Sequence, residues 1–280
     1  MSWEARLLRR LPPTWRRPLH RMLWLPVDLI EAATGRRPAL QPPRGLSYVG
    51  AGDGVAIGGE FLGYFRDLAG LSPSDRVLDV GCGIGRMAVP LTAYLADGTY
   101  DGFDISAADI RWCRGNISRS YPTFRFHHAD VINREYNPKG RISAADFAFP
   151  FSEDAFDFSF ATSVFTHFLT PALERYLDEL ARVLRSGGVL CATFFLVDEE
   201  ARRSIAEGRT ELRFEHSHGA AWVHDKDNPE GAVAYSWETV EQLFARRGFE
   251  VTARHPGTWS GRGGGVSYQD LVIARWTRDG

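Results

Sequence analysis

The chain has 280 residues, with 33 Lys and Arg against 35 Asp and Glu, so its formal net charge at pH 7 is −2. Its hydrophobic content of 44% and charged content of 24% are ordinary for a globular protein, and the near-neutral charge gives no indication of nucleic-acid binding. Cys82, Cys113 and Cys191 are too few and too scattered for a disulfide framework or a zinc site, which favours a reducing cytoplasm. The apolar run 22–27 is too short to cross a bilayer or to form a signal-peptide core.

Residues 1–44 differ in character from the rest of the chain. Arginines between Arg6 and Arg37 are opposed only by Glu4, Asp28 and Glu31, and leucines and tryptophans lie between them. This pattern predicts a basic amphipathic N-terminal extension, and such a segment can lie on an anionic membrane surface. The favoured interpretation is that the extension packs on its own domain, or on a second copy of the chain by self-association.

From residue 45 to residue 280 strands and helices alternate, which predicts one α/β domain. We expect a doubly wound, Rossmann-like sheet of about seven strands, mostly parallel and with an antiparallel last strand. The predicted strands are 76–80, 99–103, 123–128, 156–161, 189–195, 249–254 and 267–276. The predicted helices are 60–69, 84–95 with a kink at Pro90, 107–118, one capped by Thr170, and one from Ser236 to Gly248.

The most informative stretch runs from Val77 to Arg86, where a buried strand meets a glycine-rich turn that opens a helix. Glycines at three alternate positions allow a ligand to lie against the backbone. Arg86 stands where the dinucleotide fingerprint has its third glycine, so a pyrophosphate is not the favoured ligand. Asp79 lies just before the turn, and its charge suits a cationic ligand. The segment predicts a site for a nucleoside-containing, positively charged cofactor.

This stretch resembles motif I of the class I S-adenosylmethionine (SAM)-dependent methyltransferases, whose cofactor carries a sulfonium and an ammonium group. Asp146, the pair Pro150-Phe151, Phe156-Asp157 and the segment 182–190 extend the resemblance, and segments 162–167 and 267–270 resemble a bacterial branch of methyltransferase-domain proteins. The resemblance covers about residues 45–280 and implies SAM as the cofactor. The cofactor-binding residues that it implies are Asp79, Gly81, Cys82, Gly83, Gly85, Arg86, Asp104, Ile105, Asp130, Val131 and Thr162.

Two acidic positions have alternative roles. Asp104 ends the second strand, 19 residues after Gly85, where a carboxylate accepts hydrogen bonds from ribose hydroxyls. Its alternative role is to cap the next helix, although Ser106 could serve as that cap. Asp130 closes the third strand, where the resemblance implies a contact with the adenine amine. The insertion 132–145 leaves Asp146 as the alternative for this contact.

Methyl transfer is an in-line displacement that depends on alignment, and a hydroxyl nucleophile also benefits from a general base. His167 follows the fourth strand of the sheet at the edge where the cofactor is expected, so it is the candidate catalytic base. The alternative is that His167 only packs against the cofactor or orients a loop. His127 and His128 are adjacent on a strand and therefore point to opposite faces, which favours structural roles for both.

An insertion at about 208–235 follows the fifth strand, and we expect it to be rich in loops and to recognise the substrate. Its histidines and carboxylates show no spacing typical of metal ligands, so we predict no metal site. A second segment, with Trp259, Arg262 and the glycines of 261–265, is either a lid over the site or a solvated turn.

Several acceptor classes are disfavoured. The chain lacks the Asn/Asp-Pro-Pro-Tyr/Phe motif of base-amine and glutamine methyltransferases, the Pro-Cys motif of cytosine C5 methylation, and a basic face that could follow phosphates. The sequence therefore predicts methyl transfer from SAM to a small-molecule, sugar or lipid-linked acceptor. A hydroxyl is the favoured acceptor group. The alternatives are an N- or C-methyltransferase acting on a metabolite, or a non-catalytic SAM-binding scaffold subunit.

Overall fold

The computed structural model describes residues 13–47, 54–134 and 136–278. Arg6, Arg9 and Arg10 of the predicted extension lie outside these residues. Contacts divide the chain into two compact units. The first unit comprises residues 1–68, 72–74 and 82–141, and the second comprises 69–71, 75–81 and 142–280. The boundary at residues 81 and 82 falls inside the glycine-rich turn.

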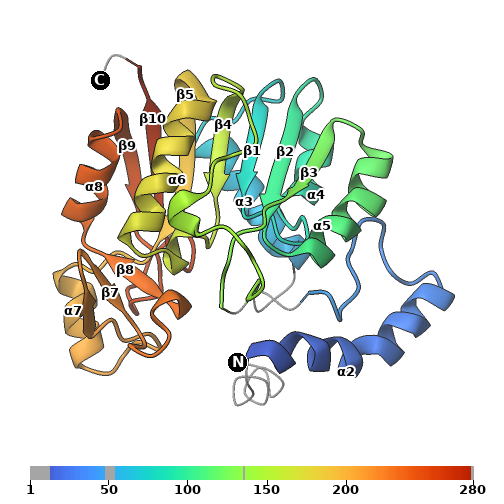
Figure 1. The fold of residues 1–280 in the computed structure, drawn as a ribbon, viewed down its shortest axis with the longest axis horizontal. Coiled ribbons are helices and arrows are strands. Elements are labelled where there is room, and N and C mark those ends of the chain that lie inside the picture. Colours follow the sequence, from blue (N-terminus) through green and yellow to red (C-terminus); the bar gives the residue numbers. More distant parts are fainter. Residues whose placement is uncertain (1–12, 48–53, 135, 279–280) are drawn as a thin grey trace. The chain divides into compact units, whose positions relative to one another are not determined.

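Seven strands form one sheet in the order β3-β2-β1-β4-β5-β10-β9 (Figure 1). Pairing is parallel between β2 and β3, β1 and β4, and β4 and β5, whereas β10 is antiparallel to both β5 and β9. The bounds are β1 (Arg76–Val80), β2 (Thr99–Asp104), β3 (Phe124–His128), β4 (Phe156–Ala161), β5 (Leu184–Phe194), β9 (Phe249–His255) and β10 (Asp270–Trp276). The predicted α/β sheet of about seven strands, with an antiparallel last strand, is confirmed.

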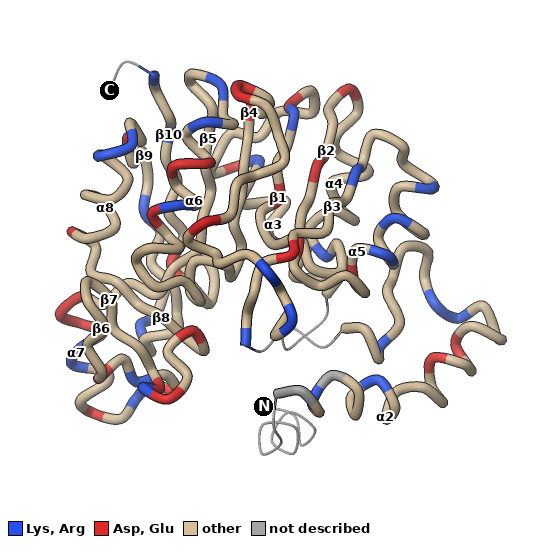
Figure 2. Tube along the Cα trace, viewed as in Figure 1, with Lys and Arg blue, Asp and Glu red and all other residues tan. Residues whose placement is uncertain are grey.

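Helices precede or connect most of these strands. The α-helices are α2 (Pro13–Ala33), α3 (Gly54–Asp67), α4 (Ala88–Tyr94), α5 (Ala107–Cys113), α6 (Thr170–Val183), α7 (Glu199–Ala206) and α8 (Trp237–Ala245). A π-helical turn continues α5 over Arg114–Ser118, and single 3-10 turns form at Ala144–Asp146, Phe165–His167 and Pro229–Gly231. In α2, which is the described helical part of the predicted extension, the acidic residues lie toward the C-terminal end (Figure 2).

Some predicted helix and strand ends are wrong, for local reasons. Helix α4 begins at Ala88, so Pro90 lies in the first turn, where amides have no acceptor within the helix, and no kink is required. Thr170 is the first residue of α6 rather than its cap, which is Leu169. By contrast, the cap at Ser236 is confirmed, because its side chain accepts a hydrogen bond from the amide of Thr239 at 3.1 Å.

The start of the fifth strand, predicted at residue 189, is a second difference. Strand β5 already begins at Leu184 and includes these residues, and its pairing with β4 shifts register between Phe156 and Phe158. Gly187 has a φ of 82°, a conformation that favours glycine. The glycines therefore form an irregularity within β5 instead of a loop before it.

The insertion at 208–235 is rich in loops, as expected, but it also contains a small sheet. Three short strands, β6 (His216–His218), β7 (Ala221–Val223) and β8 (Val233–Tyr235), pair antiparallel in a second sheet. A separate apolar core lies beside it, formed by Phe195, Val197, Ala201, Ile205, Phe214, Ala232, Ala234 and Trp259. Since Trp259 is 3% exposed and Arg262 pairs with Asp198 at 2.8 Å, the segment 259–265 is anchored at both residues and is not a solvated turn there.

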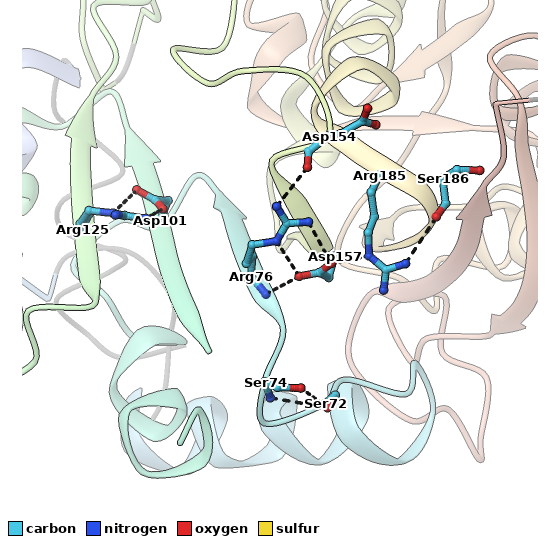
Figure 3. A network of polar contacts seen from close by, with 9 residues as sticks. All are labelled: Ser72, Ser74, Arg76, Asp101, Arg125, Asp154, Asp157, Arg185 and Ser186. Carbon is cyan, nitrogen blue, oxygen red and sulfur yellow. Dashed lines mark hydrogen bonds and ion pairs between the residues drawn. The ribbon is translucent and has the colours of Figure 1, made fainter. Parts of the chain in front are cut away.

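Arginine–aspartate pairs join neighbouring strands within each unit (Figure 3). In the second unit the Arg76 guanidinium donates to Asp157 at 2.9 Å and to the Asp154 carbonyl at 3.1 Å, and Arg185 also pairs with Asp157. Burial alone would raise the pKa of Asp157, but these hydrogen bonds lower it to about 2. The carboxylate of Asp157 is therefore charged over the whole physiological pH range.

In the first unit Asp101 on β2 is the corresponding carboxylate. It accepts hydrogen bonds from Arg125 at 2.6 Å and pairs with His127 at 2.7 Å, both on β3. His128 instead contacts the carbonyl of Ile105 at 3.3 Å. The two adjacent histidines thus have different partners, as their opposite directions on the strand predict.

Candidate cofactor and acceptor site

The glycine-rich turn after β1 uses its three glycines for different reasons. Gly81, Gly83 and Gly85 have φ values of 79°, 52° and 77°, in the left-handed region that favours glycine. A Cβ on Gly81 would lie 2.4 Å from a methyl of Val164, and one on Gly85 would lie 2.6 Å from the δ-methyl of Ile117. A Cβ on Gly83 meets no atom within 4 Å. Only Gly83 therefore leaves space for a ligand, while Gly81 and Gly85 allow close packing of the protein itself.

Asp104 connects this turn to the end of β2. Its Oδ2 accepts a hydrogen bond from the amide of Gly83 at 2.9 Å, and its Oδ1 accepts one from the amide of Ser106 at 2.7 Å. Ser106 is the cap residue of α5 but makes no capping bond with its side chain. Asp104 is therefore not the cap of α5, and its carboxylate instead bonds to the amides of the glycine turn and of the cap residue Ser106. Each carboxylate oxygen can accept a second hydrogen bond, so the arrangement is also compatible with a ribose hydroxyl.

The remaining residues of the turn pack against the first unit. Cys82 is 6% exposed, and its amide donates to the carbonyl of Phe103 at 3.0 Å. Gly102 on β2 makes room for Cys82, since a Cβ there would lie 2.8 Å from the Cβ of Cys82. Arg86 lies against α3, where a Cβ on Gly58 would come within 2.5 Å of the Arg86 carbonyl oxygen.

The two acidic candidates for the adenine contact lie in different surroundings. Asp130 follows β3, and its carboxylate pairs with Arg141 at 2.5 Å and lies 3.5 Å from the amide nitrogen of Asn137. The hydrogen bond from Arg141 lowers the pKa of Asp130. This pairing holds the loop 130–141 together, with Val131 buried beneath it at 3% exposure. Asp146 is exposed in the 3-10 turn Ala144–Asp146 of the second unit.

In the second unit Asp79 is buried on β1 at 2% exposure, and Thr162 directly follows β4. The next residue, Ser163, has a φ of 59°, which is strained for a residue with a side chain. Two contacts hold it there. Its amide donates to the Thr193 hydroxyl at 2.7 Å, and the Gln269 side-chain amide donates to its hydroxyl at 3.0 Å. The chain just after β4 is therefore fixed in one conformation.

His167 lies in the 3-10 turn that follows this strained residue. Its Nδ1 is 2.9 Å from the backbone carbonyl oxygen of Glu230. Because a carbonyl can only accept, Nδ1 carries the hydrogen, and Nε2 is then the basic nitrogen of the neutral ring. Glu230 belongs to the inserted segment, so this segment sets the tautomer of His167.

Sequence reasoning missed Ser163, Thr193, Gln269 and Glu230. The segments 162–167 and 267–270 were noted for their resemblance to methyltransferase-domain proteins, but nothing local showed that Gln269 contacts Ser163. Ser163 and Thr193 are 30 residues apart along the chain, Ser163 and Gln269 are 106 apart, and His167 and Glu230 are 63 apart. A contact between positions so far apart has no signal in the spacing of one sequence.

Other groups in the described part of the chain do not form a second site. No group of three or more His, Cys, Asp or Glu among those residues could hold a metal ion. His224 accepts a hydrogen bond from the amide of Arg213 at 2.9 Å, which gives it a structural role. A cavity of about 560 Å³ lies between α2 and the start of α5, and none of the predicted site residues lines it.

The fold and this turn define a class of protein. A mostly parallel sheet, a glycine turn after β1 and a carboxylate at the end of β2 are typical of Rossmann-like domains that bind nucleoside-containing cofactors. Residues 77–188 match the family described as a methyltransferase domain. Over these residues the chain is similar to that family, which agrees with the resemblance to SAM-dependent methyltransferases that the sequence motifs carry.

Curated relatives carry methyltransferase names. The chain is 28% identical to a sterol 24-C-methyltransferase of Schizosaccharomyces pombe, over 52% of this chain and 34% of that protein. It is 31% identical to a phthiotriol/phenolphthiotriol dimycocerosates methyltransferase of Mycobacterium ulcerans, over 49% and 42%. It is 32% identical to a fatty-acid O-methyltransferase of Mycolicibacterium smegmatis, over 47% and 40%. The matched regions thus span well under half of each relative's own length.

Solved structures support the fold. A protein of Pyrococcus horikoshii aligns with a TM-score of 0.54 and 19% identity, over 79% of this chain and 90% of that one. The cyclase SpnF aligns with the same TM-score, 0.54, and 17% identity, over 81% and 86%. At these identities the likeness concerns the fold alone. None of the helices described for this chain has the length and apolar character of a membrane-spanning segment.

Proposed function

We propose that the chain transfers a methyl group from SAM to a hydroxyl group of a lipid or lipid-linked acceptor. The family match supports methyl transfer. The names of the curated relatives, which refer to sterol, dimycocerosate and fatty-acid substrates, favour a lipid among the acceptors that the sequence leaves open. The observation that carries the proposal of a hydroxyl acceptor is the hydrogen bond between His167 Nδ1 and Glu230, because it leaves Nε2 as a base.

The donor half of the site fits SAM. Gly83 has room for a ligand beside it, because a Cβ there would have no atom within 4 Å. The Asp104 carboxylate, which bonds to the Gly83 amide, can accept hydrogen bonds from ribose hydroxyls. SAM supplies a methyl group on a positively charged sulfur. Asp79, Gly81 and Thr162 of the second unit remain predicted cofactor contacts, together with Cys82, Gly85, Arg86, Ile105, Asp130 and Val131 of the first.

In the acceptor half His167 would take the hydroxyl proton on Nε2 as the oxygen forms its bond to the methyl carbon. A positioned base of this kind typically contributes about 10²–10⁴-fold to the rate. Glu230 holds the imidazole by its backbone carbonyl, so the ring is oriented before the acceptor binds. The fixed conformation at Ser163 also helps to position the 3-10 turn that contains His167. The remaining contribution is alignment of acceptor and donor.

The test is a methyl-transfer assay with labelled SAM and a panel of hydroxylated lipids, carboxylated lipids and sugars. The variant is His167→Asn, because the asparagine amide can still donate to Glu230 but cannot act as a base. We expect turnover on a hydroxylated lipid to fall by about 10²–10⁴-fold, while the affinity for SAM is unchanged.

His127→Asn is the matched control, since His127 pairs with Asp101 on the sheet and should not affect turnover. Binding of SAM without transfer to any member of the panel would favour the scaffold alternative. Transfer to an amine or carbon acceptor alone would favour the N- or C-methyltransferase alternative. A loss below about fivefold would show that His167 only shapes the site.

A further inference from the structure

Helix α2 presents its apolar side to solvent. Trp15, Met22 and Leu29, spaced seven residues apart, lie on one stripe of the helix and are 66%, 64% and 61% exposed. Leu25 and Ile30 flank this stripe and are 52% and 58% exposed. A surface helix of a globular protein normally turns such a stripe toward the core. Met22 and Leu25 also line the cavity between α2 and the start of α5. Trp15, Leu29 and Ile30 do not line it, so this part of the stripe is available for a partner.

The opposite side of α2 holds the helix on its own unit. His20 lies 3.4 Å from the carbonyl oxygen of Gly45, and the Asp28 carboxylate accepts hydrogen bonds from the amides of Arg44 and Gly45 at 2.7 and 2.9 Å. The Arg44 guanidinium also lies 5.4 Å from the centre of the Trp24 ring. The polar side is thus the packed side, which is the reverse of the usual arrangement.

The charge around the stripe is positive. The acidic groups of α2 are paired within the same segment, since Asp28 contacts Arg37 at 3.3 Å and Glu31 contacts Arg44 at 2.8 Å. Toward the N-terminal half of the described helix no acidic residue appears in Figure 2. In the sequence, residues 1–27 contain six arginines and one acidic residue. By helical periodicity Arg16 and Arg21 flank the stripe on its two sides.

We propose that the outward side of α2 rests on an anionic lipid surface. Apolar side chains would enter the boundary between headgroups and acyl chains, and flanking arginines would reach the phosphates, as in other interfacial helices. A second copy of the chain is the less favourable occupant, because two such helices would bring like charges together. The proposal rests on the exposure and charge of α2 and does not depend on methyl transfer.

The experiment is co-sedimentation of the full chain with vesicles of phosphatidylcholine, alone or with about 30% phosphatidylglycerol, at low and at high salt. The variant Leu29→Glu/Ile30→Glu places charges on the part of the stripe that lies outside the cavity. We expect the wild-type protein to bind the anionic vesicles at least about tenfold more strongly than the neutral ones, with binding weakened by salt. The variant should bind the anionic vesicles at least about tenfold more weakly than the wild type.

Val55→Glu/Ile142→Glu is the matched control. Both residues are exposed apolar side chains outside α2, at 57% and 39% exposure, and the pair changes the net charge by the same amount. The control should bind like the wild type, and thermal unfolding should be unchanged for both variants because all four side chains are exposed. If the double variant fails to fold, Leu29→Glu alone serves as the test.

Three results would overturn the proposal. The first is that the wild-type protein does not bind anionic vesicles at low salt. The second is an equal loss of binding in the control, which would indicate a general charge effect. The third is a dimer in light scattering that the α2 variant converts to a monomer without any vesicle binding, which would assign the stripe to a second copy. None of these results affects the SAM-binding or transfer assays, so the two proposals fail independently.

Discussion

Replacing each glycine of the turn by alanine separates packing from cofactor binding. The three changes are chemically identical, and all three residues have positive φ values, of 79°, 52° and 77°. Their surroundings differ, because the new methyl group would meet Val164 in Gly81→Ala, Ile117 in Gly85→Ala, and no atom in Gly83→Ala. The structure therefore predicts different losses for the same substitution.

The left-handed conformation costs an alanine about 1–2 kcal/mol relative to glycine, and this cost applies to all three variants. A methyl forced to within 2.4 Å of Val164 or 2.6 Å of Ile117 adds a packing cost of about 1–3 kcal/mol. Ile117 is fully buried, so its δ-methyl cannot move without displacing other side chains. We expect Gly83→Ala to lower the free energy of unfolding by about 1–2 kcal/mol and the other two variants by about 2–5 kcal/mol.

For SAM affinity the ranking of the three variants should be the reverse of their ranking for stability loss. Gly83→Ala should have the smallest effect on stability and the largest effect on binding. Gly83→Ala fills the only open position of the turn, so its affinity for SAM should fall by at least about tenfold, equivalent to about 1.4 kcal/mol. Denaturant unfolding gives the stability and titration calorimetry gives the affinity. Gly63→Ala is the control, because Gly63 lies within α3 with no atom within 4 Å of a Cβ. It should stabilise the protein by up to about 1 kcal/mol and leave binding unchanged.

Unchanged SAM affinity in a well-folded Gly83→Ala variant would refute this reasoning. The cofactor would then not approach the backbone at Gly83, and the role of the turn would be packing alone. Equal stability losses in all three variants would contradict the contacts assigned to Gly81 and Gly85.

Two further substitutions test contacts of the second unit. The lowered pKa of Asp157, about 2 against 3.8, means that its ion pairs with Arg76 and Arg185 stabilise the fold above pH 4 and are lost as pH falls toward 2. Asp157→Asn should lower the free energy of unfolding by about 1–2 kcal/mol at pH 7, and urea titrations should show this difference shrinking between pH 4 and about 2. Asp270→Asn should cost about 1–3 kcal/mol, because the Asp270 carboxylate accepts hydrogen bonds from the Trp259 indole at 2.7 Å and from two backbone amides. Near-ultraviolet circular dichroism should report the displaced Trp259, and an unchanged spectrum with full stability would contradict this role.

Much of the fold follows from local sequence signals. Strands 76–80 and 156–161 were predicted with the bounds that the structure gives, because each is short, rich in apolar residues and followed by turn residues or glycine. The cap at Ser236 was predicted from the residue type alone, since its hydroxyl only needs the amide of Thr239 three residues on. The contact between Gly83 and Asp104 belongs to the same category, because the two residues are 21 positions apart in the chain.

Other features were not predictable because they depend on contacts far apart along the chain. Strands β6, β7 and β8 have three residues each, too few to show an alternating pattern, so the segment read as loop. Trp259 is surrounded by glycines in sequence but is buried among residues that follow β5, residues of α7 and residues of the inserted segment. Its burial depends on the hydrogen bond to Asp270, which a sequence pattern does not reveal.

The donor and acceptor parts of the proposed site differ in the same way, since one depends on short-range contacts and the other on a long-range contact. The donor residues Gly83 and Asp104 lie inside the matched family segment 77–188, and they are held by hydrogen bonds to neighbouring backbone. His167 also lies inside that segment, but the group that orients it, Glu230, lies outside. A cofactor shared by a whole family can be bound by a short local motif, whereas the acceptor differs from one member to another. If His167 is the base, changes in the 208–235 insertion would alter its orientation and the acceptor specificity together, without disturbing the binding of SAM.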